Sequence, residues 1–388
     1  MTEPAFNETI GEDEGERTVT VLELFFDLVF VLAITQVTAF LAEHQSARGV
    51  CEGLVILALL WWSWVGYAWL TNTIDLEDTP TRLAFFAAMS GFVILALATP
   101  SAFGASSVAF AAAYGVVRSM QVALYVRGAR ERPAERDAIL GLAPGFFASV
   151  VLLIVGAIIG GDAQLVLWSI ALVFDIGIPI VRSTDGFHVH AGHFAERHGL
   201  IVIIALGESI VAVGNGAAGE PLTTAIVVGA ALAVSLSAAM WWAYFDIVAT
   251  VAAHRLGQLQ GDARNTLARD AYSYLHFFMV AGIVLAALGI EQTLAHASEP
   301  LRTVPALALC VGPALYLVGH IAFRRRNVGS WSRTRPIATI VLLAFIPAAS
   351  ELDALAALAV VTLIVVTLVA FETIRYSESR ARMKAELA

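Results

Sequence analysis

The chain has 388 residues, of which 59% are hydrophobic and 14% are charged, and its formal net charge is −9. Soluble domains carry roughly 25% charged residues, so this composition excludes a water-soluble fold of this size. The acidic balance gives no sign of nucleic-acid binding. The two cysteines, Cys51 and Cys310, form no CxxC pattern, so neither a disulfide framework nor a zinc site is expected.

Twelve apolar runs follow one another along the chain. A transmembrane helix needs about 20 predominantly apolar residues to cross the hydrocarbon core of a bilayer. The run at 336–350 is the shortest. The sequence predicts an all-α membrane protein of about 12 transmembrane helices, embedded in a lipid bilayer, with spans near 20–41, 50–70, 83–101, 105–126, 138–160, 163–181, 198–214, 222–250, 271–290, 303–323, 336–350 and 354–374.

The 23 basic residues indicate an orientation for these helices. If the N-terminus is cytoplasmic, the outside loops hold only Arg48 and Arg302, Arg118 lies within a helix, and every other basic residue falls in a cytoplasmic segment. Cytoplasmic loops of membrane proteins carry an excess of Lys and Arg. We therefore expect a multipass protein of the bacterial inner membrane with both termini in the cytoplasm.

The two halves of the chain resemble each other weakly. Residues 28–36 align with 200–208, and 61–64 align with 241–244. Two six-helix halves have the same orientation, which is a parallel repeat; chance matches between apolar stretches are the alternative. The predicted segments are an acidic cytoplasmic tail (1–18), a first six-helix repeat (19–182), a His-rich cytoplasmic linker (183–197), a second six-helix repeat (198–376) and a basic cytoplasmic tail (377–388).

Five ionisable side chains fall inside the predicted helices: Asp27, Arg118, Asp175, Glu208 and Asp246. Each costs at least ~2.5–3.5 kcal/mol to insert, which makes it a functional candidate by default. Counting residues along each helix predicts that all five lie in one layer in the cytoplasmic half, joined by His276. We expect Arg118 to pair with Asp27 or Glu208; the alternative is that the layer only joins helices together.

Glu208 is the sharpest of these candidates. It lies between Gly207 and Ser209 in an otherwise apolar run. A glycine at that place allows another backbone to approach closely. We expect Glu208 to bind an ion or to carry a proton.

The first predicted helix carries a polar stripe. Glu23 and Asp27 are i,i+4 neighbours, and Thr35 continues their face. Such a stripe lines an ion pathway or stabilises a helix–helix contact, and both interpretations stay open. The candidates for a transport or ion pathway are Glu23, Asp27, Thr35, Gln36, Arg118, Asp175, Glu208, Ser209 and Asp246.

A histidine-rich segment precedes the seventh predicted helix. It contains one aspartate and four histidines: Asp185, His188, His190, His193 and His198. Their spacing matches no recognised zinc pattern such as HExxH, so interfacial histidines are favoured over a metal site. Glu196 and Arg197 are expected to open the helix, where an acidic residue suits the helix dipole.

Four motifs resemble the bacterial low temperature requirement protein A (LtrA) family. They are LELFFDLVFV at 22–31, AITQ at 33–36, ERHGL at 196–200 and ALGESI at 205–210. Together with the Trp-Trp pairs they occur in the family's order and span nearly the whole chain. The resemblance implies a multipass membrane protein with a part in growth at low temperature, and it implies no defined chemistry.

A shorter likeness concerns the first helix alone. The sequence FFD at 25–27, followed by AIT at 33–35, is similar to the Phe-Ser-Asp motif of potassium channels built from six-helix repeats. Phe26 stands where that motif has serine. The first helix of each repeat lines the pore in that family, so the likeness implies a cation channel.

Two classes of function are left. A secondary transporter or cation channel for a small ion or solute would use the buried polar residues as its pathway. A non-transporting membrane protein that supports the cell envelope in the cold would use them to hold helices together. No nucleophile elbow, phosphate-binding loop or HExxH motif occurs, so we expect neither an enzyme nor a cofactor. Homo-oligomer formation is left open.

Overall fold

The computed structural model describes residues 17–182, 186–378 and 380–382. The described residues form helices joined by short loops and no strand. In chain order the elements are α1 (Val21–Glu43), α2 (Ala47–Leu70), α3 (Thr79–Ala98), the 3₁₀ turn η1 (Thr99–Ser101), α4 (Ser107–Gly128), α5 (Pro133–Ile159), α6 (Gly161–Val181), α7 (Ala191–Gly216), α8 (Thr224–Phe245), α9 (Val248–Gly257), α10 (Gly261–Leu267), the π-helical segment η2 (Ala268–Leu275), α11 (His276–Ala295), α12 (Thr303–Val328), α13 (Arg335–Ala349) and α14 (Ala354–Arg375).

Eleven helical spans of the described chain are long and apolar enough to cross a membrane. Helix α13 falls short of them with 15 residues. It is about 22 Å long, whereas the hydrocarbon core is about 30 Å thick. The prediction of an all-α multipass membrane protein is confirmed, and the described residues contain eleven full spans together with the shorter apolar helix α13. The arrangement as two parallel repeats stays a prediction.

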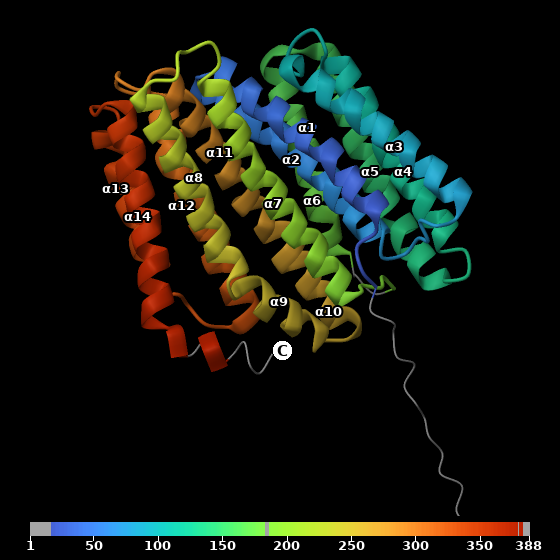
Figure 1. Cartoon of the computed structure of the whole chain (residues 1–388). Coiled ribbons are helices and arrows are strands. Elements are labelled where there is room, and N and C mark those ends of the chain that lie inside the picture. The colour runs from blue at the N-terminus through green and yellow to red at the C-terminus, as the bar shows by residue number, and fades with distance from the viewer. Residues whose placement is uncertain (1–16, 183–185, 379, 383–388) are drawn as a thin grey trace, which may run out of the picture.

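Figure 1 shows a bundle in which α1–α6 and α7–α14 lie side by side. Helix α1 packs against α7 and α11 at the boundary, and α2 also contacts α11. The start of α1 and the end of α14 lie on one face of the bundle, beside α9 and α10 (Figure 1). We call this face the terminal face, and the one across the bundle the opposite face.

Helix α11 occupies the centre of the second half, and most of its side chains are buried. Glycines bring it close to α12. An ideal Cβ on Gly282 would lie 2.6 Å from the carbonyl oxygen of Gly312, and one on Gly289 would lie 2.6 Å from the Cα of Leu309. Small residues let transmembrane helices approach in this way, so glycines fix the close contact between α11 and α12.

Polar side chains fix two helix starts at the terminal face. Thr20 and Glu23 form a capping box at α1, in which the Thr20 N–H donates to the Glu23 carboxylate at 2.8 Å. Asp78 caps α3. Hydrogen bonds from Thr81 and Arg127 hold the pKa of the Asp78 carboxyl below its usual range. The first cap places Glu23 at the base of the α1–α7 contact.

The region around α7 differs from the prediction. Helix α7 begins at Ala191, so Arg197 lies well inside the helix instead of opening it. Between α8 and α11, the chain forms the short helices α9 and α10 and the segment η2, none of which was predicted. An apolar-run criterion finds spans of about 20 residues and does not separate short helices at the ends of those spans.

Candidate functional site

The α1–α7 contact contains a buried network of charged side chains. Arg197 on α7 has Nη1 at 2.9 Å from Glu23 Oε1 and Nη2 at 2.7 Å from Asp27 Oδ1. His193, one turn before Arg197, has Nε2 at 2.8 Å from the same Glu23 oxygen. All four side chains are fully buried. Residues four apart share a helix face, so two i,i+4 pairs meet across the contact.

Helix α2 completes this network. Trp64 Nε1 donates to Asp27 Oδ1 at 2.8 Å, and Arg197 Nη1 donates to Thr71 Oγ1 at 3.5 Å. The Arg197 guanidinium also lies 5.7 Å from the centre of the Trp64 ring. Two carboxylates thus face one guanidinium and one imidazole. With both carboxylates ionised, the four side chains together are neutral only when the imidazole carries a second proton. We call these residues the α1–α7 network: Glu23, Asp27, Trp64, Thr71, His193 and Arg197.

Glu208 lies farther along α7 in different surroundings, about 16 Å from Arg197 along the helix. It is 1% exposed, and its Oε2 accepts a hydrogen bond from Thr35 Oγ1 of α1 at 2.7 Å. Among the described residues, its Oε1 has no hydrogen-bond partner and no cationic side chain pairs with it. Glu208 is therefore a buried carboxyl group that has a hydroxyl donor and, in the described part of the chain, no counter-charge.

A second acidic side chain, Glu291 of α11, lies near Glu208. The two carboxylates are close enough to interact, and Glu291 Oε2 is buried with no hydrogen-bond partner in the described part of the chain. Nearer the opposite face, Gln45 Nε2 donates to Gln292 Oε1 at 2.9 Å. Polar groups therefore continue from Glu208 towards the opposite face. Glu291 is not among the residues predicted from the sequence because it directly follows the predicted span 271–290, although an acidic residue at the end of an apolar run was a usable signal.

Arg118 and Asp175 form a separate buried pair between α4 and α6. Arg118 Nη2 lies 3.5 Å from Asp175 Oδ1, and its Nη1 donates to Gln121 Oε1 at 2.6 Å. The Tyr114 hydroxyl donates to Asp175 Oδ2. The guanidinium lies 4.0 Å from the centre of the Phe146 ring. The pair joins α4 to α6 and is held on several sides.

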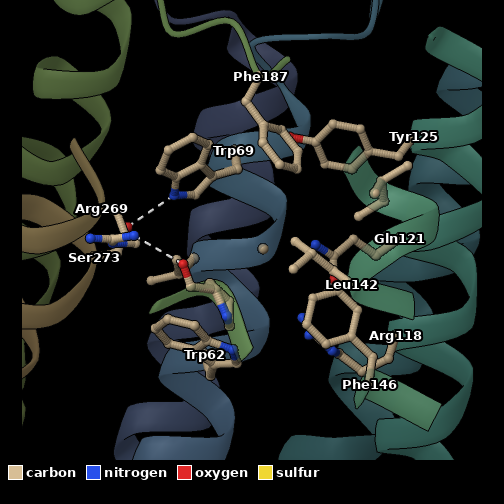
Figure 2. Close-up of a pocket in the computed structure, with 14 residues that line it drawn as sticks. Trp62, Trp69, Arg118, Gln121, Tyr125, Leu142, Phe146, Phe187, Arg269 and Ser273 are labelled. Atoms are coloured by element: carbon tan, nitrogen blue, oxygen red, sulfur yellow. Dashed lines mark hydrogen bonds between the residues drawn. The ribbon is translucent and has the colours of Figure 1, made fainter. Parts of the chain in front are cut away.

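Arg118 also lines a cavity of about 70 Å³ between α2, α4, α5 and η2. Figure 2 shows Trp62 and Trp69 on one side of it and Phe146 with Arg118 on the other. Trp69 Nε1 donates to Ser273 Oγ at 2.9 Å. A buried water needs roughly 10–15 Å³ of such volume, so a few waters would fill the cavity. No residue of the α1–α7 network lines it.

The comparisons with known proteins concern most of the chain. The profile of the family described as "Bacterial low temperature requirement A protein (LtrA)" matches residues 18–370. An uncharacterized protein of Rhizobium meliloti (strain 1021) is 31% identical over 326 residues, which cover 81% of this chain and 79% of that protein. This chain belongs to the LtrA family. The resemblance seen in the sequence motifs is confirmed.

In this LtrA-family protein the motif segments meet in space. Segment 22–31 of α1 and segment 196–200 of α7 supply Glu23, Asp27 and Arg197 to the network. Segments 33–36 and 205–210 bring Thr35 to Glu208. The four motifs therefore describe one contact between α1 and α7.

The predicted single layer of charges is wrong for this LtrA-family protein. Arg118 pairs with neither Asp27 nor Glu208. Asp246 caps the end of α8 at the terminal face, where its Oδ2 lies 2.9 Å from Arg380. Counting residues along a helix predicts the height of a side chain but not which helices are neighbours, so the layer divides into separate groups.

The remaining candidates have modest surroundings. Gln36 is half-buried, and Ser209 is buried with no hydrogen-bond partner for its Oγ among the described residues. Glu196 accepts a hydrogen bond from the Val19 N–H at 3.2 Å. A Cβ added to Gly207 would meet nothing within 4 Å. The expected close approach of another backbone at Gly207 is therefore wrong.

The histidine-rich segment is divided between a loop and a helix. His193 belongs to the network, and the His198 ring lies 5.2 Å from the Trp64 ring. The rings of His188 and His190 lie 4.8 Å apart. Asp185 lies outside the described residues. Within the described ranges, no group of three or more His, Cys, Asp or Glu is placed to hold a metal ion.

Proposed function

We propose that this LtrA-family protein transports a small cation, with Glu208 as the carboxylate that holds the cation or an exchangeable proton. The observation that carries the proposal is the lack of a counter-charge. Glu23, Asp27 and Asp175 each face an arginine. Glu208 faces the Thr35 hydroxyl and no cationic side chain among the described residues.

A lone carboxylate is costly inside a bilayer, so the group binds a proton or a cation instead of remaining bare. The neighbouring Glu291 strengthens the preference for positive charge. The hydrogen-bonded pair of Gln45 and Gln292 lies between these carboxylates and the opposite face, and continues the polar side chains in that direction. Positive ions would therefore reach Glu208 from that face.

The α1–α7 network supports the proposal as a closed end of the pathway. Its charged groups are fully buried and bridge α1 to α7 between Glu208 and the terminal face. Passage beyond Glu208 requires Arg197 to separate from Glu23 and Asp27. Such a rearrangement of two packed halves is the usual basis of alternating access.

We further propose that the terminal face is cytoplasmic and that the membrane is the bacterial inner membrane. Arginines of the described chain lie mostly at this face, for example Arg130, Arg182, Arg324 and Arg333. The excess of Lys and Arg on cytoplasmic loops supports that side. The family description supports a part for the transport in growth at low temperature.

Flux measurements test the proposal. The full chain is reconstituted in liposomes, and H⁺, Na⁺ and K⁺ movements are followed with imposed gradients against protein-free liposomes. Saturable exchange would mark a secondary transporter, and unsaturated conductance would mark a channel. Absence of flux for all three ions would contradict the proposal.

A second candidate is a non-transporting membrane protein that supports the envelope in the cold. The paired charges favour it, because Arg197 with Asp27 and Arg118 with Asp175 each join two helices. In that case, null flux would accompany a growth defect at low temperature when the gene is deleted.

A further inference from the structure

A cluster of arginines surrounds a cavity that the proposed transport does not use. This cavity, of about 500 Å³, lies at the terminal face among the ends of α9, α12, α13 and α14. Its lining includes five arginines and one acidic residue: Arg324, Arg333, Arg335, Arg375, Arg380 and Glu372. We call it the arginine pocket.

Two of the five arginines are already neutralised. Arg335 pairs with Glu372 at 3.1 Å, and Arg380 pairs with Asp246 at 2.9 Å. The other three, Arg324, Arg333 and Arg375, are exposed and have no carboxylate partner among the described residues. The arginine pocket therefore carries about three uncompensated positive charges, which favours an anion.

An apolar groove adjoins the arginine pocket and shares Trp331 with it. The groove has a volume of about 900 Å³, runs between α12 and α13, and is open to the surroundings. Val318, Ile321 and Ile340 line it, and Arg325 and Arg326 stand at the same site. One ligand with a phosphate and an acyl chain would match both spaces.

The short helix α13 places this site at headgroup depth. Arg335, the first residue of α13, pairs with Glu372, which lies before the end of α14. Helix α13 therefore starts about one helical turn deeper in the bundle than the point at which α14 ends. Trp331 in this loop is 64% exposed, and exposed tryptophans favour the membrane interface.

We propose that the arginine pocket binds the phosphate of an anionic phospholipid from the leaflet at the terminal face, with an acyl chain in the α12–α13 groove. Arg324, Arg333 and Arg375 supply the charge, and Arg335 stays committed to Glu372. This site is separate from the Glu208 pathway and does not depend on the proposed transport.

Lipid-dependent thermal stability tests the site. The full chain, purified in detergent, is heated with phosphatidylglycerol, with phosphatidylcholine of the same acyl chains, or with soluble glycerol phosphate. We expect phosphatidylglycerol alone to raise the unfolding midpoint. An equal shift with phosphatidylcholine would contradict recognition of the negative headgroup. An equal shift with glycerol phosphate would show a site for small anions and would contradict the binding of a lipid.

Matched variants locate the effect. The triple variant Arg324→Gln, Arg333→Gln and Arg375→Gln should weaken the apparent phosphatidylglycerol affinity at least about tenfold, because each arginine near an anionic headgroup contributes to binding. The control removes the same charge at the other end of the terminal face: Arg130→Gln, Arg136→Gln and Arg182→Gln. Equal affinity in the two triple variants would overturn the site. If the first triple variant does not fold, Arg333→Gln alone is compared with Arg130→Gln by lipid retention in native mass spectrometry.

Discussion

At the scale of single residues, the buried carboxylates differ in whether a cationic side chain faces them, and this difference separates those with a structural role from the proposed functional one. Glu23 and Asp27 share one guanidinium, and Asp175 faces Arg118. Charges paired in this way hold helices in place, and removing one partner leaves the other buried without compensation. Glu208 lacks such a partner in the described chain, which is why the proposed function assigns the exchange of a proton or cation to its carboxyl group.

Replacing Arg197 should destabilise the fold. Arg197→Gln leaves Glu23 and Asp27 buried without their cation, a loss of about 3–5 kcal/mol in unfolding free energy. The loss is measured by denaturation in detergent micelles. Adding Glu23→Gln and Asp27→Asn to Arg197→Gln should restore part of the stability, since no buried charge is then uncompensated. A triple variant no more stable than Arg197→Gln would contradict the assignment of these residues to one network.

At the scale of elements, glycine has two different roles in this bundle. Gly282 brings α11 against α12, where a Cβ would lie 2.6 Å from backbone atoms. Gly207 faces open space beside Glu208. The α11–α12 contact is therefore fixed by close backbone approach, while α7 has no such contact at Gly207.

The two glycines should respond differently to alanine. Gly282→Ala forces helices apart and should cost about 1–3 kcal/mol, the usual range for overpacking. Gly207→Ala adds the same methyl group without a clash and should be neutral or slightly stabilising, because alanine is the better helix former. The midpoints of thermal unfolding of the two variants test this difference. Equal midpoints would contradict the close packing of α11 against α12.

At the scale of the whole molecule, the membrane class and the family could be predicted from the sequence, and the pairing of charges could not. Apolar runs give spans because each must cover the bilayer thickness. The partners of Asp27 and Arg118 depend on which helices are neighbours, and that depends on packing between distant segments. His193 and Arg197 were readable in principle, because their i,i+4 spacing matches that of Glu23 and Asp27.

The orientation of the molecule is open to chemical labelling. In a Cys51→Ser background, Glu220→Cys lies in the α7–α8 loop at the opposite face, and Gly329→Cys lies in the α12–α13 loop at the terminal face. A membrane-impermeant maleimide should label Glu220→Cys in intact spheroplasts, and Gly329→Cys only after permeabilisation, because the positive-inside rule places the arginine-rich face in the cytoplasm. The reverse pattern would invert the orientation.

The most direct measurement of the central claim is cation flux into proteoliposomes that contain the wild-type chain, Glu208→Gln or Glu220→Gln. Both substitutions remove one carboxylate, but Glu220 is exposed in a loop, whereas Glu208 is buried with no counter-charge among the described residues. We predict that Glu208→Gln abolishes flux while folding like the wild type, and that Glu220→Gln leaves it unchanged. Flux that survives Glu208→Gln at the wild-type rate would contradict the account.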